Sequence, residues 1–276
     1  MAQTMTNDRK TIFPLGPHPL PPHPCGVNFA ATDQNTMHTV PHRLLDDGPL
    51  QPDAFTAAMT QWIVNHHVKP EFIESDRRRR EALARQGLVD PSRSRLPTAD
   101  KTKKGNWAEI LLAEYVAASC GAQLPVYRLR YNPNVDQSMK GDDVLAFDLD
   151  SDPARVLVGE AKFRTTPNKQ VVEDLVGALV KSHSANIPAS LQFVADMLFE
   201  ARNNELGSKV ASCNALFAQG RLQLDYVGLL VSSRDAHLHV QRNAKSSISR
   251  LAVISLGLGD PEGIVTASYA GARGLV

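Results

Sequence analysis

The chain has 276 residues, of which 42% are hydrophobic and 21% are charged, a composition that supports a folded core. Its 30 Lys and Arg balance 29 Asp and Glu, so no global field points to nucleic acid, and local patches must carry any such interaction. Three scattered cysteines form no CxxC pair, which argues against a disulfide framework and a zinc site. The chain has no secretory signal pattern and no apolar run near the ~20 residues of a membrane span, so we expect a cytoplasmic protein.

Residues 1–50 are expected to be a flexible leader. The part from 13 to 24 is rich in Pro and His and lacks the periodicity of a helix or a strand. Proline has no amide donor and clashes with the preceding turn of a helix, so this part is predicted to be extended. The irregular spacing of its histidines does not favour a metal-binding tract.

Residues 51–100 are predicted to be a mainly helical region that ends in a basic linker. Between 52 and 68, apolar residues recur every three or four positions, as on one face of an amphipathic helix: these are Phe55, Met59, Trp62 and Ile63. The adjacent His66 and His67 are interpreted as polar residues near the end of this helix. No further ligand lies at the spacing that a metal site needs.

The segment from 76 to 104 is the one basic block of the sequence, with ten Lys and Arg against four acidic residues. Two interpretations are open. The block is either a solvated helix and linker, or a surface that contacts the phosphates of a nucleic acid. Prolines and serines near 90–100 favour a domain boundary or hinge there.

The third region, 101–276, is predicted to alternate helices and strands. A helix is indicated from 106 to 120, and Glu109 lies in its first turn, a position that the helix dipole alone would favour. Alternation of apolar and cationic residues over 125–131 predicts a strand. The remaining predicted elements are strands over 144–149, 155–163 and 222–232, and helices over 171–180, 191–198, 206–218 and 244–254. This pattern indicates an α/β fold.

The stretch from 141 to 162 concentrates the residues that suggest chemistry. Glu160 and Lys162 lie two positions apart on a strand, so they face the same way, and Asp143 can meet them if the two neighbouring strands pair. Close carboxylates repel each other by roughly 4 kcal/mol per pair at an effective dielectric constant near 20. A divalent cation removes that cost, and oxygen ligands favour Mg²⁺ over zinc.

The motifs Gly141-Asp142-Asp143 and Gly159-Glu160-Ala161-Lys162 resemble the signature of the PD-(D/E)xK nuclease superfamily. The resemblance implies a restriction-endonuclease-like core with a mixed central sheet flanked by helices, and a glutamate on the first helix that matches Glu109. Gly-Asp-Asp replaces the usual Pro-Asp here. Either aspartate is therefore a candidate ligand; we favour Asp143, because it directly precedes an apolar strand, with Asp142 as the competing residue.

Three longer stretches, 104–109, 126–131 and 139–145, resemble the HamA family, the nuclease subunits of Hachiman anti-phage defence systems. The similarity covers about residues 100–235. It implies a cytoplasmic, Mg²⁺-dependent DNA endonuclease or nickase, with Mn²⁺ as a substitute metal. It also implies a heterodimer with a HamB-like helicase subunit, which we expect to restrain the nuclease.

The resemblance assigns a role to each site residue. Asp143, Glu160 and the Ala161 carbonyl oxygen are expected to bind the metal, and Glu109 to be an accessory ligand or a base that orients water. Lys162 is the expected catalytic cation, which orients the water or stabilises the transition state. A weaker set of expected DNA phosphate contacts comprises Arg128, Arg130, Lys140, Arg164 and Lys169.

Two other functions fit the same residues. The first is a catalytically silent module that binds DNA or regulates the helicase, although such a module has no need to keep all four of Glu109, Asp143, Glu160 and Lys162. The second is a resolvase of branched DNA, which differs in the geometry of its substrate.

Overall fold

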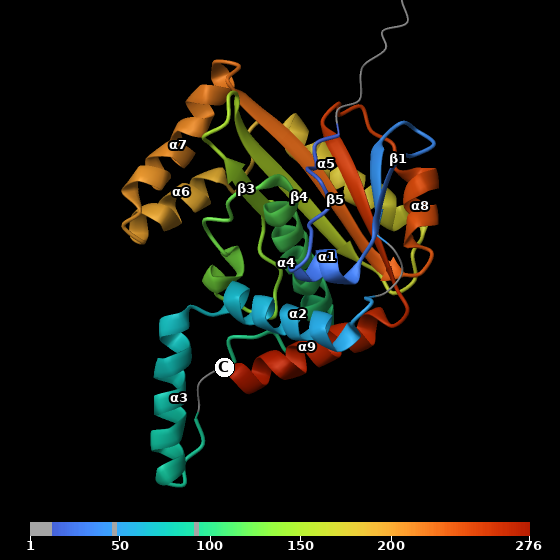
Figure 1. Cartoon of the computed structure of the whole chain (residues 1–276). Helices are drawn as coiled ribbons and strands as arrows, with labels where there is room; N and C mark the ends of the chain where they lie inside the picture. The colour runs from blue at the N-terminus through green and yellow to red at the C-terminus, as the bar shows by residue number, and fades with distance from the viewer. Residues whose placement is uncertain (1–12, 46–48, 91–93) are drawn as a thin grey trace, which may run out of the picture.

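A six-stranded mixed sheet forms the centre of the molecule (Figure 1). The computed structural model describes residues 13–45, 49–90 and 94–276. The strands lie in the order β1-β2-β6-β5-β4-β3. Their bounds are β1 (Ala31–Asn35), β2 (Pro41–Leu45), β3 (Val144–Asp148), β4 (Ala154–Phe163), β5 (Leu222–Ser233) and β6 (Leu251–Leu258).

The four central strands, β2, β6, β5 and β4, run parallel, and the edge strands β1 and β3 are antiparallel to their neighbours. Parallel strands are covered by helices on both faces, so they consist of nearly continuous apolar runs. All eight residues of β6 are buried, as that position requires. The predicted α/β class with a mixed sheet is confirmed.

Two layers of helices cover the sheet, and each has its own buried apolar cluster. One face carries α1 (Pro24–Asn28), α2 (Pro52–His67), α4 (Asp100–Cys120) and α9 (Pro261–Leu275). The other face carries α5 (Lys169–Ser184), α6 (Leu191–Glu200), α7 (Asn204–Ala218) and α8 (Ala236–Asn243). The helix α3 (Pro70–Arg85) projects from the body (Figure 1), and none of its residues, all of them described, is buried. Within the described part of the chain, no helix is long and apolar enough to cross a membrane.

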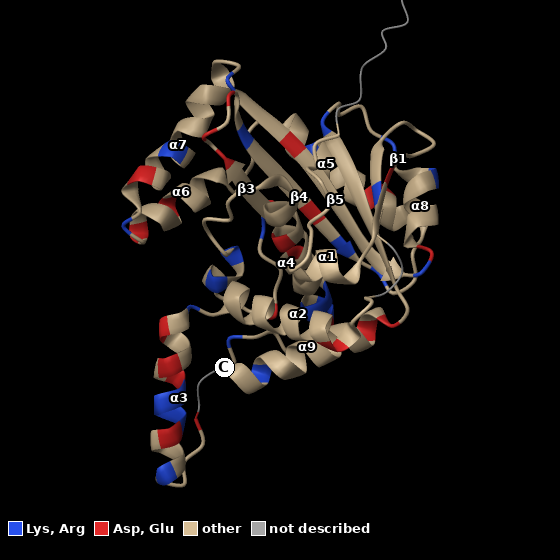
Figure 2. Cartoon of the chain, viewed as in Figure 1, with Lys and Arg blue, Asp and Glu red and all other residues tan. Residues whose placement is uncertain are grey.

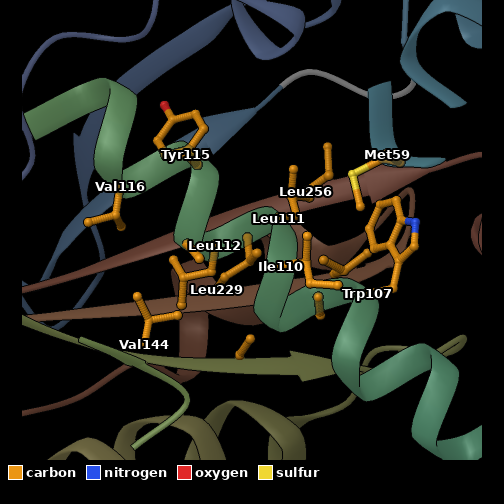
Figure 3. Close-up of a cluster of buried hydrophobic side chains, with 14 of the residues drawn as sticks. Met59, Trp107, Ile110, Leu111, Leu112, Tyr115, Val116, Val144, Leu229 and Leu256 are labelled. Carbon is orange, nitrogen blue, oxygen red and sulfur yellow. The ribbon is translucent and has the colours of Figure 1, made fainter. Parts of the chain in front are cut away.

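The helix α4 is the central element of the first face. Its middle turns are apolar almost all the way round, because the helix lies between the sheet and the helices α2 and α9. Figure 3 shows Trp107 and Ile110 of α4 beside Met59 of α2 and Leu256 of β6. This packing holds rigidly the helix that carries Glu109.

The expectation of a flexible leader is wrong for residues 13–45. This segment forms α1, β1 and β2, and β2 pairs parallel with β6 near the other end of the chain. Arg43 of β2 is only 2% exposed and forms an ion pair with Asp33 of β1 at 2.6 Å. These short strands lack a clear period of their own and are stabilised by pairing with a distant strand. Residues 1–12 lie outside the described part.

Two other predicted elements differ from the structure. Residues Arg128–Tyr131 form a 3₁₀ helix, η1, and not a strand. In the described segment between α4 and β3, pairing with the sheet is limited to one bridge between Gln123 and Phe147. The predicted helix over 244–254 is absent from these described residues: β6 begins at Leu251, between β2 and β5. The other predicted strands and helices from 144 to 232 are confirmed.

Candidate active site

The hairpin of β3 and β4 brings the two motifs together. Val144 pairs with Gly159 in antiparallel register, so β4 runs on beyond the start of β3 and leaves residues 160–163 at an open edge. Across this edge the Ala161 amide donates a hydrogen bond to Oδ2 of Asp143 at 3.0 Å. Lys162 Nζ lies 2.5 Å from Oε1 of Glu160.

The two adjacent aspartates have different surroundings. Gly141 has φ of +112°, and a Cβ at this position would lie 2.4 Å from Ser190 Oγ, so the turn before the aspartates requires glycine. Asp142 accepts hydrogen bonds from the Ser190 amide at 3.1 Å and from Ser182 Oγ at 2.8 Å. Its carboxylate is therefore used in holding the loop to α5 and α6, and Asp143 is left to face Ala161.

Arg128 connects Glu109 of α4 to Asp143. Its Nε lies 3.7 Å from Oε1 of Glu109, and its Nη1 lies 3.8 Å from Oδ1 of Asp143. The guanidinium also donates hydrogen bonds to the carbonyl oxygens of Lys140 and Asp142, and the side chain is 12% exposed. The sequence suggested a phosphate contact at Arg128; in the structure it is a nearly buried cation between two acidic groups.

The pKa values of the Glu109, Asp143 and Glu160 carboxyl groups are all raised. Burial is the largest cause for each of them, and it raises the pKa of Glu109 well above its ordinary value. Asp143 adds to the rise at Glu109 and at Glu160 by charge repulsion. At Asp143 the Ala161 amide and Arg128 oppose the rise in pKa. Carboxyl groups in this condition are stabilised by further positive charge at their centre.

A cleft of about 640 Å³ opens at this edge of the sheet, and Glu109, Asp143 and Lys162 line it. The basic block of the sequence includes Lys101 and Lys104, but sequence reasoning did not place them beside Glu109, although a signal was present. Lys101 and Gly105 precede Glu109 by eight and four positions, so they lie on the same face of the helix. The additional lining residues include Lys101, Lys104, Gly105, Asn106, Ser138 and Met139.

The expected phosphate contacts do not form one row. Arg164 lines the cleft, and Lys169 lies in a second hollow beside it. Arg130 lies over the ring of Tyr127 and donates a hydrogen bond to a carbonyl oxygen of α2. Lys140 is exposed, and no described contact joins its ammonium group to the cleft.

The basic block is largely compensated where it forms α3. Figure 2 shows alternating bands of basic and acidic residues along this helix. Arg77 and Arg78 both pair with Glu74 at 2.7 Å, and Asp76 pairs with Arg79 and Arg95. These pairs favour a solvated helix over a phosphate surface. Residues 91–93, which belong to the expected hinge, lie outside the described part.

The oxygen donors of the site suit Mg²⁺ in their chemistry. In the described residues, however, no three His, Cys, Asp or Glu side chains are already gathered around one metal position. Arg128 and Lys162 are instead the positive charges that face the carboxylates. Binding of a divalent cation would therefore require these two side chains to move or to share their partners.

Known proteins resemble this chain over most of its length. A family model described as HamA matches residues 26–271. The Hachiman protein HamA of Bacillus cereus is 37% identical over 222 residues, which cover 80% of each chain. The family match includes the hairpin of β3 and β4 and also the two strands β1 and β2.

Proposed function

The chain belongs to the HamA family, and we propose that it is a metal-dependent DNA nuclease, an endonuclease or nickase, of an anti-phage defence system. The observation that carries this proposal is the meeting of Glu109, Asp143, Glu160 and Lys162 at the open edge of β4. These groups come from a helix and a strand hairpin. Glu109, Asp143 and Lys162 line one cleft, and Glu160 forms an ion pair with Lys162 beside it. Three carboxyl groups with raised pKa values beside a lysine suit phosphodiester hydrolysis.

Asp143, Glu160 and the Ala161 carbonyl oxygen would hold Mg²⁺, with Glu109 as an accessory ligand or water-orienting base. Bound Mg²⁺ would lower the pKa of a water molecule and neutralise charge on the scissile phosphate. Lys162 is within reach of Glu160, so it can orient the attacking water or stabilise the charge of the transition state. Mn²⁺ offers the same preference for oxygen ligands.

Lys101, Lys104 and Arg164 would receive the DNA at the mouth of the cleft. Lys104 pairs with Glu262 at 2.5 Å, and Arg164 is exposed. Each phosphate that such a cation neutralises releases counterions, so binding would weaken as salt concentration rises. These three residues, with Lys169 beyond them, form the proposed first part of the DNA path.

We expect a helicase-like partner to restrain the nuclease in the cytoplasm, because an unrestrained DNA nuclease would harm its own host. The membership in the HamA family supports this expectation. Cleavage of plasmid should be slow in the complex at physiological Mg²⁺ and should rise when the complex is activated. Rapid cleavage of plasmid by both the isolated chain and the resting complex would contradict the restraint.

The central experiment compares cleavage by the wild type, Glu160→Ala and Lys162→Ala in Mg²⁺, with the partner present. Both variants should lose cleavage. Lys209→Ala on α7, which pairs with Asp150 on the surface, is the control and should cleave as the wild type does. Equal cleavage by all four proteins would refute the assignment. Linear, nicked and four-way DNA substrates would separate an endonuclease or nickase from a branched-DNA resolvase.

The second candidate is a module that binds DNA or regulates the helicase without cutting DNA. It is favoured by the cations that face the carboxylates, since Arg128 and Lys162 already supply the positive charge that a metal would bring. Such a module would bind DNA equally well with and without Mg²⁺. It would also keep its role in defence after Glu160→Ala.

A further inference from the structure

A second hollow lies beside the cleft, across the helix α5. It has a volume of about 490 Å³ and is bordered by α5 and α8, two helices that pack against each other. Glu173 and Gly177 of α5 line both the hollow and the cleft. The two spaces are therefore neighbours that share one wall, and we call the second one the α5–α8 groove.

The α5–α8 groove is cationic. Lys169, Arg242 and Lys245 line it together with His38, and Glu173 is its one acidic residue. Among the described residues, Arg242 and Lys245 have no acidic group within ion-pair distance. Lys169 pairs with Glu173 at 3.3 Å, but both side chains are largely exposed, and such a surface pair is weak. The groove therefore offers three cations to an anionic ligand.

Gly177 forms the low ridge between the groove and the cleft. It lies exposed in the middle of α5, where glycine disfavours a helix relative to alanine. A Cβ at this position would meet no atom within 4 Å, so packing does not require glycine. Its lack of a side chain instead leaves the passage over α5 open, from the cleft at one side to the cations at the other.

The spacing suits the backbone of a nucleic acid. Lys169 and Gly177 are eight residues apart on α5, which corresponds to about 12 Å along a helix axis. This is the length of three to four nucleotide steps at about 3.4 Å per step of one strand. A strand that leaves the cleft over Gly177 would reach Lys169 within that distance, and Arg242 and Lys245 line the same groove.

We propose that the α5–α8 groove is a second DNA-binding site, which holds the phosphates of the strand as it leaves the cleft. This inference rests on the proposed nuclease function and adds a direction to the DNA path. The groove would contribute to affinity and to the minimum length of DNA that binds well. It would carry no sequence specificity, since phosphate contacts position a nucleic acid without reading its bases.

The test measures DNA binding without cleavage, in the full chain carrying Glu160→Gln. The probes are fluorescent duplexes of about 8 and about 24 base pairs, whose affinity is measured by anisotropy over a range of salt concentrations. Arg242→Glu with Lys245→Glu should weaken binding of the long duplex at least about tenfold and reduce the salt slope by nearly 2, about 0.9 per lost contact. The short duplex should be affected less.

The control carries two charge reversals far from the groove: Lys209→Glu on α7 and Arg221→Glu in the turn between α7 and β5. It should change the affinity for both duplexes only slightly, because distant exposed charges are screened. A loss as large in the control as in the groove variant would mean that net charge alone matters. Unchanged affinity and salt slope in the groove variant would overturn the proposal.

The ridge provides a second, independent measurement. Gly177→Ala should raise the melting temperature, because alanine favours the helix, and should keep long-duplex binding. Gly177→Glu should also fold, since there is open space for the side chain, but should weaken binding of the long duplex. Equal binding by the alanine and glutamate variants would contradict a passage over this ridge.

The failures of the two proposals can be told apart. If Glu160→Ala cleaves as the wild type does, the nuclease assignment fails, whatever the groove binds. If cleavage depends on Glu160 but the groove variants bind long DNA normally, the groove inference alone fails. If these variants instead lose co-purification with the helicase-like partner and keep DNA binding, the groove is a protein interface, which also overturns the inference.

Discussion

Asp142 and Asp143 are neighbours in the sequence, but their carboxylates have separate partners. The Asp142 carboxylate is held by the Ser190 amide and by Ser182 Oγ. The Asp143 carboxylate accepts a hydrogen bond from Ala161 on the adjacent strand and lies near Arg128. The division assigns a structural role to the first aspartate and leaves the second available for the site chemistry.

This division predicts opposite effects for substitutions at the two aspartates. Asp143→Asn should reduce Mg²⁺-dependent cleavage by more than about 100-fold, the upper end of the losses caused by removing a partner of a metal ligand. It should leave stability unchanged or raise it, because it removes a buried charge. Asp142→Ala should lower the free energy of unfolding by about 1–3 kcal/mol, since the Ser190 N–H and the Ser182 hydroxyl would both lose their acceptor. Cleavage assays and urea unfolding measure the two effects, and the reverse pattern would exchange the two roles.

The position of Arg128 leads us to expect that its substitution changes the affinity for the metal. Its guanidinium lies 3.7 Å from Oε1 of Glu109 and 3.8 Å from Oδ1 of Asp143. It therefore neutralises part of the negative charge that would attract a divalent cation. Arg128→Met should tighten Mn²⁺ binding about tenfold, which corresponds to about 1.4 kcal/mol, as measured by calorimetry. Arg128→Lys, which keeps the charge, should change it less. Weaker Mn²⁺ binding by the methionine variant would instead show that Arg128 is needed to hold the loop at 140–142.

The burial of His67 leads us to expect that the stability of the fold depends on pH. The sequence indicates a polar residue near a helix end. In the structure His67 is 5% exposed, and its Nδ1 has no hydrogen-bond partner among the described residues. Burial lowers its pKa to about 3, and the charge of His66 adds to that effect. Because the unfolded chain takes up this proton near pH 6.5 and the folded chain does not, stability is lost as the pH falls from about 6.5 toward 3.

The loss attributed to His67 should be about 2 kcal/mol between pH 7 and pH 5, at about 1.4 kcal/mol per pH unit. His67→Leu should remove most of it in urea unfolding at the two pH values. His38→Ala, at an exposed position, should keep the full dependence. An unchanged slope in His67→Leu would mean that other groups, such as His66, determine the pH response.

Because β2 pairs with β6, we expect that a chain shortened to residues 51–276 is not stable. Removal of β1 and β2 would expose the edge of β6, which is buried along its whole length and mostly apolar, and such an open edge promotes aggregation. Arg43→Met should lower the free energy of unfolding by about 2 kcal/mol, below the 3–5 typical of a fully buried pair, since Asp33 is half-exposed. Arg85→Met on exposed α3 should stay within about 0.5 kcal/mol. A stable, monomeric 51–276 fragment would contradict this role.

The elements that sequence patterns predicted well are those whose cause is local. The stripe of apolar residues on α5, and the two apolar runs of β3 and β4 with the turn between them, are complete within a short window. The same holds for the site: Asp143, Glu160 and Lys162 lie on one hairpin, so their meeting follows from strand alternation and register. Glu109 is the exception, since its position depends on packing of α4 against the sheet, and the family resemblance supplied it.

By itself, then, the sequence determined the α/β class, the hairpin and the acidic groups at its open edge, because the side-chain period and the turn act over a few residues. Only the tertiary structure decided that β2 pairs with β6, that Arg128 lies between Glu109 and Asp143, and that the α5–α8 groove adjoins the cleft. Each of these depends on contacts between segments far apart in the chain. Such contacts depend on how much apolar surface is buried and which charges pair over the whole fold. A pattern within a few residues of the sequence does not contain that information.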